Sequence, residues 1–251
     1  AECEGTVKLQ VFTHRKVALT IYIDGERSPR EPEIETGPNG VYLTIAKDLE
    51  RGVHEFRIVN RTQFIWGNVS FGNVRINGSF LDKPAERELF LEFYGDSITC
   101  GYGNMRAEGA EDNKELQNGL YTYAAITARE LNAEYSAVCR SGIGLYTHRA
   151  TFKRVMKDIL DYVSTESEAK WQTDDAPDVV IINLGTNDSW TGQDYGQYKK
   201  YDRNDFKAAY ISFIEKIGEK QKVLQTTYKR QDVFATASIG EVACVSVMVF
   251  K

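Results

Sequence analysis

Cysteine and histidine are scarce in this chain, whose 251 residues include four cysteines and three histidines. No two cysteines have the Cys-x-x-Cys spacing, which excludes a zinc ribbon or a thioredoxin-like motif. Four cysteines in a chain of this length are also too few for a disulfide scaffold, so we expect free thiols. No residues have the spacing of metal ligands, and we expect neither a metal nor another cofactor.

Long apolar runs and clusters of positive charge are absent as well. The longest apolar stretches, such as residues 179–182, are far shorter than the roughly 20 residues of a membrane-spanning helix. Lys and Arg number 31 against 36 Asp and Glu, and no basic tract is available for phosphate contacts. We therefore expect neither a nucleic-acid partner nor a membrane partner. The first residues show no signal peptide.

Residues 5–80 are patterned as antiparallel strands. Apolar and polar residues alternate, with Gly and Asn between the runs, in the segments 7–11, 18–23, 41–45, 53–59 and 69–76. Asp24-Gly25 and Asn39-Gly40 are typical turn dipeptides. Short strands at this spacing predict an N-terminal all-β sandwich of jelly-roll type over residues 1–82.

The pattern changes after a polar segment, 83–88, which holds Pro84 and is the predicted linker. Buried-strand runs then cover 89–94, 136–139 and 178–184, and helical patterns cover 119–131, 152–163 and 206–217. In the last helix Asn204 or Asp205 is the expected cap, and Gly218 the expected end. Strands that alternate with helices predict a three-layer α/β domain with a parallel sheet over residues 89–251.

A serine follows the first of these strands in Gly95-Asp96-Ser97-Ile98-Thr99-Cys100-Gly101-Tyr102-Gly103. A serine in a sharp turn at a strand end can expose its hydroxyl as a nucleophile, and its own N–H can face a developing oxyanion. The same residues also describe a plain turn with a capping serine. The Gly-x-Ser-x-Gly elbow of α/β-hydrolases occurs nowhere in the chain.

Two further strands end in residues that can donate hydrogen bonds. Arg140-Ser141-Gly142-Ile143-Gly144 brings glycine backbone close to a ligand, with Gly142 favoured over Gly144 as the donor. In Leu184-Gly185-Thr186-Asn187-Asp188, the Asn187 amide can donate to an oxyanion, and Asp188 can brace the loop by accepting backbone N–H groups. Each segment alone also describes an ordinary turn.

In this order the three motifs resemble the SGNH (GDSL-type) hydrolase superfamily over residues 89–218. Residues 92–103 are very similar to the motif of carbohydrate esterase family 2, whose members carry an N-terminal β-sandwich and deacetylate xylan and glucomannan. The resemblance implies that Ser97 is the nucleophile, that Ser97, Gly142 and Asn187 form the oxyanion hole, and that no cofactor takes part. It also implies a secreted protein with an acetylated polysaccharide or oligosaccharide as its partner.

Aromatic residues lie beside these motifs in the sequence. Trp190, Tyr102 and Tyr146 are candidates for an apolar sugar platform, although core positions explain them equally well.

The resemblance fails at the general base. The superfamily carries it as the histidine of a C-terminal Asp-x-x-His, and no histidine follows His148 in this sequence. We expect His14 and His54 in the β-domain and His148 at the surface. No family motif is visible after residue 222, so we expect a domain that is truncated or frame-shifted there, and an impaired esterase.

Two other functions stay open on the sequence alone. The sandwich, or a cleft without its base, can bind carbohydrate without turnover. An SGNH esterase or lipase can instead act on another acyl ester. Acetate release distinguishes the first alternative from a deacetylase, and a comparison of acyl chain lengths distinguishes the second.

Overall fold

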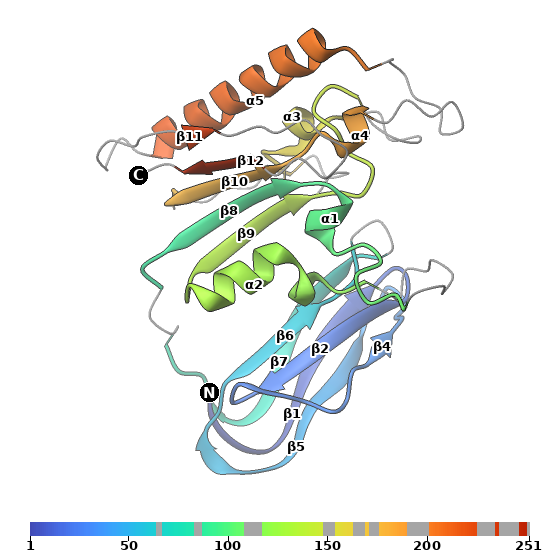
Figure 1. The fold of residues 1–251 in the computed structure, drawn as a ribbon. Helices are drawn as coiled ribbons and strands as arrows, with labels where there is room; N and C mark the ends of the chain where they lie inside the picture. The colour runs from blue at the N-terminus through green and yellow to red at the C-terminus, as the bar shows by residue number, and fades with distance from the viewer. Residues whose placement is uncertain are drawn as a thin grey trace. The chain divides into compact units, whose positions relative to one another are not determined.

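The computed structural model describes residues 1–63, 67–82, 87–107, 117–147, 154–162, 169–170, 176–189, 201–224, 234–235 and 246–249 (Figure 1). Their contacts divide the chain into two units. The first holds Ala1–Ala85 and Gly103–Leu120, and the second holds Glu86–Tyr102 and Tyr121–Lys251. The sequence patterns did not predict that residues 103–120 belong to the first unit. The predicted limits 1–82, 83–88 and 89–251 stay a prediction, since residues 83–86 lie outside the described part.

Antiparallel strands in two sheets build the first unit. One sheet has the order β5-β1-β7, from Val41–Val53, Glu2–Thr13 and Val69–Ser79. In the other, β2 (Val17–Ile23) pairs with β3 (Glu26–Arg27), β4 (Glu33–Ile34) and β6 (Phe56–Asn60). The alternating apolar residues of both sheets form one core, to which β1 gives Val7, Leu9 and Val11 and β2 gives Val17, Leu19 and Ile21.

The alternation therefore predicted a two-sheet β-unit correctly, while the jelly-roll connectivity stays a prediction. The single strand expected over 53–59 is wrong, because β5 ends at Val53 and β6 begins at Phe56. The turn between them is held by hydrogen bonds from the His54 N–H to the Ala1 carbonyl and from the Glu55 N–H to Asp24 Oδ1.

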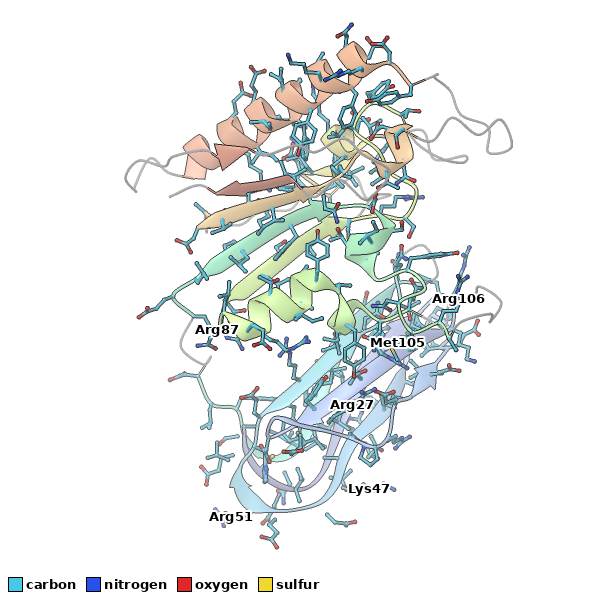
Figure 2. The ribbon with its side chains drawn as sticks, viewed as in Figure 1. Arg27, Lys47, Arg51, Arg87, Met105 and Arg106 are labelled. Atoms are coloured by element: carbon cyan, nitrogen blue, oxygen red, sulfur yellow. The ribbon has the colours of Figure 1, made fainter. Side chains whose placement is uncertain are left out.

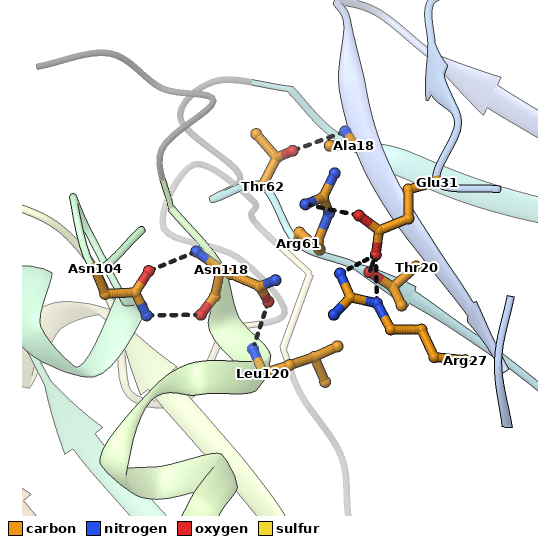
Figure 3. Close-up of polar contacts among 9 residues, drawn as sticks. All are labelled: Ala18, Thr20, Arg27, Glu31, Arg61, Thr62, Asn104, Asn118 and Leu120. Atoms are coloured by element: carbon orange, nitrogen blue, oxygen red, sulfur yellow. Dashed lines mark hydrogen bonds and ion pairs between the residues drawn. The ribbon is translucent and has the colours of Figure 1, made fainter. Parts of the chain in front are cut away.

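Segment 103–120 belongs to this β-unit by its contacts, and Figure 3 shows polar contacts within the segment and, separately, among residues of the strands. The side chain of Asn104 donates to the Asn118 carbonyl at 2.9 Å and accepts the Asn118 N–H at 2.8 Å. These two hydrogen bonds join the beginning of the segment to its end. Gln63, which follows β6, donates to Gln117 at 2.6 Å. Nearby in the same unit, Glu31 accepts the Thr20 hydroxyl at 3.1 Å and pairs with Arg27 and Arg61. The Gln63–Gln117 bond therefore links the second described end of the segment to the β-unit.

A five-stranded sheet in the order β11-β12-β10-β8-β9 forms the centre of the second unit. Its strands are β8 (Phe90–Gly95), β9 (Glu134–Cys139), β10 (Val179–Asn183), β11 (Phe234–Ala235) and β12 (Ser246–Val249). As predicted, β8 runs parallel to both β9 and β10. The parallel sheet is confirmed for these three strands and not beyond them, because β12 pairs with β10 antiparallel and thereby satisfies the free backbone edge of β10.

Helices cover both faces of this sheet (Figure 1). The helices are α1 (Ser97–Cys100), α2 (Tyr123–Glu130), α3 (Met156–Ile159), α4 (Thr186–Ser189) and α5 (Arg203–Leu224), with a 3₁₀ turn at Gly119–Tyr121. Alternate residues of β8 point to opposite faces. Leu91 and Phe93 pack with α2, whereas Tyr94 packs with α3 and α5. Three layers result, as the alternation of strands and helices predicted. Arg87, which precedes β8 and is labelled in Figure 2, donates to the carbonyl of Ala133 at 2.8 Å. Ala133 is the residue directly before β9.

Three details of the predicted helices are wrong. Of the helix expected over 152–163, the described residues form only α3. The helix does not extend toward the N-terminus from Met156, because the Met156 N–H donates to the Gly144 carbonyl and not to a residue one helical turn earlier. Asp202 caps α5 in place of Asn204 or Asp205, since its carboxylate accepts the N–H groups of both. Helix α5 also continues through Gly218, beyond which Lys220 is anchored to the sheet.

Candidate active site

Ser97 is the first residue of α1, directly beyond the carboxyl end of β8. Asp96 caps the helix, and its Oδ1 accepts the Ile98 N–H at 3.0 Å. A Cβ at Gly95 would lie 1.8 Å from Thr99 Oγ1, so glycine is needed for α1 to fold back against the strand. Ser97 is half-buried, and none of the described residues hydrogen-bonds its hydroxyl or accepts its backbone N–H. The sharp turn expected at this serine is present.

The glycine segment lies at the end of the neighbouring strand β9. Gly142 has φ 83°, a left-handed backbone that favours glycine. The Arg140 N–H donates to the Gly95 carbonyl at 3.2 Å, which ties this segment to the turn before Ser97. Within the described part of the chain, the Gly142 N–H has no acceptor. The segment therefore presents an open backbone donor beside the end of β8.

Asp188 connects the third motif to the second. Its carboxylate accepts the backbone N–H groups of Leu145 at 2.9 Å, Tyr146 at 3.0 Å and Thr147 at 3.1 Å. The loop brace predicted for Asp188 is thus confirmed. Burial raises the pKa of Asp188, while these donors act in the opposite direction because they stabilise the charged form.

Asn187 lies between the other two motifs and is 4% exposed. Its Nδ2 donates to the Ile143 carbonyl at 2.7 Å and lies 3.4 Å from Asp96 Oδ2. Asp96 and Ile143 are the sequence neighbours of Ser97 and Gly142. The structure therefore brings together the three residues that the motifs predicted, from the ends of three parallel strands.

Asp96 is a buried acid that the sequence analysis did not single out. It is 0% exposed, and burial, reinforced by the charge of Asp188, raises its pKa to about 6. In the same turn, Thr99 Oγ1 lies 2.9 Å from the hydroxyl of the partly buried Tyr123, and this contact joins α1 to α2. The sequence did offer a signal for this role: Asp96 stands between Gly95, at the end of a buried strand, and Ser97. An acid at such a position needs hydrogen-bond partners, since carboxylates are seldom buried without them.

The three aromatic candidates differ in their surroundings. Tyr102 is 40% exposed just after α1. The ring of Tyr146 packs against Phe206, and its hydroxyl accepts the Asp202 N–H at 2.8 Å, so this side chain holds the start of α5. Burial raises the pKa of Tyr146. Trp190 lies outside the described residues.

None of the histidines in the described part of the chain contacts these motifs. His54 lies in the β-unit, where its Nδ1 is 2.8 Å from Asp24 Oδ2, and His14 follows β1. His148 is outside the described residues. Across the described ranges, no group of three or more His, Cys, Asp and Glu could hold a metal ion. No helix among them is long and apolar enough to span a membrane.

A serine at the end of a central parallel strand, with a glycine and an asparagine at the ends of its two neighbours, defines an SGNH-type hydrolase fold. The chain belongs to the GDSL-like lipase/acylhydrolase family, whose model matches residues 93–241. This finding confirms the resemblance of the motifs.

Similar proteins with curated names are carbohydrate-active. The chain is 34% identical over 182 residues to the cellulase/esterase CelE of Acetivibrio thermocellus, a match that covers 70% of this chain and 21% of that protein. It is 29% identical over 143 residues to an acetylxylan esterase/glucomannan deacetylase of Cellvibrio japonicus, covering 55% and 40% respectively. The chain thus spans less than half the length of these relatives.

Among solved structures, a family two carbohydrate esterase from Clostridium thermocellum in complex with cellohexaose is similar. The TM-score is 0.77 at 27% identity, over 88% of this chain and 66% of that one. A family two carbohydrate esterase from Cellvibrio japonicus has a TM-score of 0.74 at 21% identity, which shows a shared fold.

Proposed function

We propose that this chain is a serine esterase that removes O-acetyl groups from a plant cell-wall polysaccharide such as xylan or glucomannan. The observation that carries the proposal is the meeting of Ser97, Gly142 and Asn187 at the ends of three parallel strands. Two of these residues offer backbone N–H groups with no acceptor among the described residues. The names of the similar proteins support a carbohydrate ester as the substrate.

The reaction is an acyl transfer through the Ser97 hydroxyl. Ser97 Oγ attacks the acetyl carbonyl carbon, and the carbonyl oxygen becomes an oxyanion. The backbone N–H groups of Ser97 and Gly142 and the Asn187 amide stabilise that charge. The oxyanion then collapses, the sugar hydroxyl leaves with a proton, and water hydrolyses the acetyl-serine.

Deprotonation of Ser97 is the weak step. A serine hydroxyl is a poor nucleophile without an adjacent base, and positioned acid–base catalysis contributes about 10²–10⁴-fold. No histidine follows His148 in these 251 residues. We therefore expect slow turnover, with the oxyanion hole as the main source of catalysis. In serine proteases that lack a triad member, the oxyanion hole and substrate binding still accelerate the reaction roughly 10³–10⁴-fold over water.

Substrate contacts around the site are part of the same proposal. Tyr102 is an exposed aromatic side chain five residues after Ser97 and can pack on a sugar ring. Trp190 and Tyr146 are the other candidates. Because Tyr146 already packs on Phe206, we expect Tyr102→Ala to raise KM more than Tyr146→Ala does. Such a substrate would place the protein outside the cell.

The decisive experiment is Ser97→Ala in the full chain. Acetate release from acetylated xylan and labelling by a fluorophosphonate should both disappear. Ser212→Ala is the control, because Ser212 on α5 accepts a hydrogen bond from the Lys157 ammonium at an exposed site. Unchanged acetate release in Ser97→Ala would refute the proposal. Loss of release in His148→Ala would identify His148 as the base.

Carbohydrate binding without turnover is the second candidate, favoured by the lack of a histidine after His148. Calorimetry with acetylated xylo-oligosaccharides distinguishes the two. Heat of binding with no acetate release and no fluorophosphonate labelling supports the binding module, whereas release that depends on Ser97 supports the esterase.

A further inference from the structure

The buried Asp96 carboxylate links the nucleophile turn to the turn that carries Asn187. Its Oδ1 accepts the Ile98 N–H at 3.0 Å within α1. Its Oδ2 lies 3.4 Å from Asn187 Nδ2, and the Thr186 hydroxyl also donates to the carboxylate. With 0% exposure, Asp96 has no solvent to replace these partners. The side chain therefore connects the turn that carries Ser97 to the turn that carries Asn187 through hydrogen bonds.

The Asn187 amide has two N–H groups, and their partners are unequal. One donates to the Ile143 carbonyl at 2.7 Å, a short bond that fixes the side chain. The other faces Asp96 across 3.4 Å, which is long for an N–H···O bond and correspondingly weak. Only this second N–H is available for a developing oxyanion.

We propose that Asp96 is a positioning residue that orients the Asn187 amide for oxyanion binding. The inference rests on the function proposed above. The carboxylate favours the amide orientation with nitrogen toward Asp96 and Ile143. In the flipped orientation, the amide oxygen would face a carboxylate and a carbonyl, which are both acceptors. During attack on the ester, the second N–H can exchange its long contact with Asp96 for a shorter bond to the oxyanion. No proton leaves Asp96 in this step.

The charge of Asp96 matters for this role, because an ionised carboxylate only accepts hydrogen bonds. Three other titratable groups act on it or sense its charge: Asp188 in α4, Cys100 in α1 and Tyr123 in α2. Burial raises the pKa of both Cys100 and Tyr123, so these two stay protonated near neutral pH. The pKa of Asp96 itself is about 6. Below that pH, Asp96 gains an O–H donor and no longer selects the amide orientation.

A double-mutant cycle tests the proposal, with Asp96→Asn, Asn187→Ala and both together. Loss of an oxyanion-hole donor costs about 10²–10³-fold in kcat. We expect Asp96→Asn to lower kcat and the rate of fluorophosphonate labelling by about 10-fold or more with KM unchanged, because the new amide turns a donor toward Asn187. Since Asp96 acts through Asn187, the double variant should react no more slowly than Asn187→Ala. Losses that multiply would overturn the proposal.

A spectroscopic readout keeps the proposal testable even if the chain releases no acetate. In ¹H–¹⁵N spectra of the full chain, the side-chain amide signals of Asn187, assigned by their loss in Asn187→Ala, should shift with a midpoint near pH 6. Asp96→Asn should abolish the shift, whereas Asp24→Asn in the β-unit should preserve it. An Asn187 signal that Asp96→Asn leaves unchanged would refute the positioning role. Absence of both acetate release and labelling, with the titration intact, would refute only the esterase function.

Discussion

Gly144 and Asp188 lie so close that a Cβ at position 144 would be 2.6 Å from Asp188 Oδ1. The same Cβ would lie 2.2 Å from the Thr147 carbonyl oxygen. The chain curls around the carboxylate here, and this curl aims three successive N–H groups at Asp188. Glycine is required at residue 144 by this close approach, which explains its presence without a role as an oxyanion donor.

We predict that Gly144→Ala disrupts the site from within. The added methyl group meets backbone and a braced carboxylate, so the loop has to move and the Asp188 hydrogen bonds are weakened. Overpacking of this kind typically costs about 1–3 kcal/mol. Urea unfolding should show a lower free energy of unfolding, and the rate of Ser97 labelling should fall because Gly142 moves with the loop.

Gly218→Ala is the matched control for that variant. Gly218 lies inside α5, and a Cβ there meets nothing within 4 Å. Alanine in a helix interior is more stable than glycine by roughly 0.5–1 kcal/mol, so this variant should unfold at higher urea. Equal destabilisation by the two substitutions would contradict the steric account of Gly144.

Much of the fold follows from sequence because burial alternates in a regular way. The period-two runs gave every long strand of the β-unit, and the runs ending at Gly95, Cys139 and Asn183 became the parallel strands β8, β9 and β10. The details that failed depend on partners distant in sequence. Gly218 is an ordinary helix end by local rules, yet Ile217 is buried and Lys220 reaches Glu92, so α5 continues.

The placement of the candidate site residues was predictable to the same degree. Ser97, Gly142 and Asn187 each stand at a strand end, and parallel strands bring such ends to one edge of a sheet. Asp96 was missed because its partners, Thr186 and Asn187, are some 90 residues away and come close only when β10 pairs with β8. The antiparallel β12 was missed for a similar reason, since the local pattern of residues 246–249 does not specify its direction.

We predict a large loss of stability in Lys220→Met. Lys220 Nζ lies 3.2 Å from both Glu92 Oε1 and the hydroxyl of Tyr94, and the Glu92 side chain is only 4% exposed. Without the ammonium, the buried Glu92 carboxylate loses its positively charged partner, and breaking a buried ion pair in this way typically costs about 3–5 kcal/mol. The free energy of unfolding in urea measures the loss.

Lys216→Met provides the comparison, because Lys216 pairs with Asp161 where both side chains are 33% exposed. An exposed pair of this kind contributes about 0–1 kcal/mol. Adding Glu92→Gln to Lys220→Met should restore part of the lost stability, since the buried charge is then removed. If Lys220→Met and Lys216→Met cost the same, the buried pair is not what holds α5.

The last prediction concerns pH and the pair of His54 with Asp24 in the β-unit. The Asp24 carboxylate, followed by the Glu50 carbonyl, raises the pKa of His54 above its ordinary 6.5, and His54 in turn lowers the pKa of Asp24. A raised histidine pKa means that the folded protein binds the proton more tightly than the unfolded chain. The stabilisation is therefore complete below pH 6.5 and is lost as pH rises through the folded pKa. Asp24→Asn should lower the His54 pKa toward 6.5 in an NMR titration and remove this dependence. Asparagine tolerates the positive φ of 53° at that turn, so the backbone is kept.

Glu55→Gln removes the same charge one residue from His54 without removing its partner, and should leave the pKa raised. A similar fall in both variants would show that net charge, and not the Asp24 hydrogen bond, sets the pKa of His54.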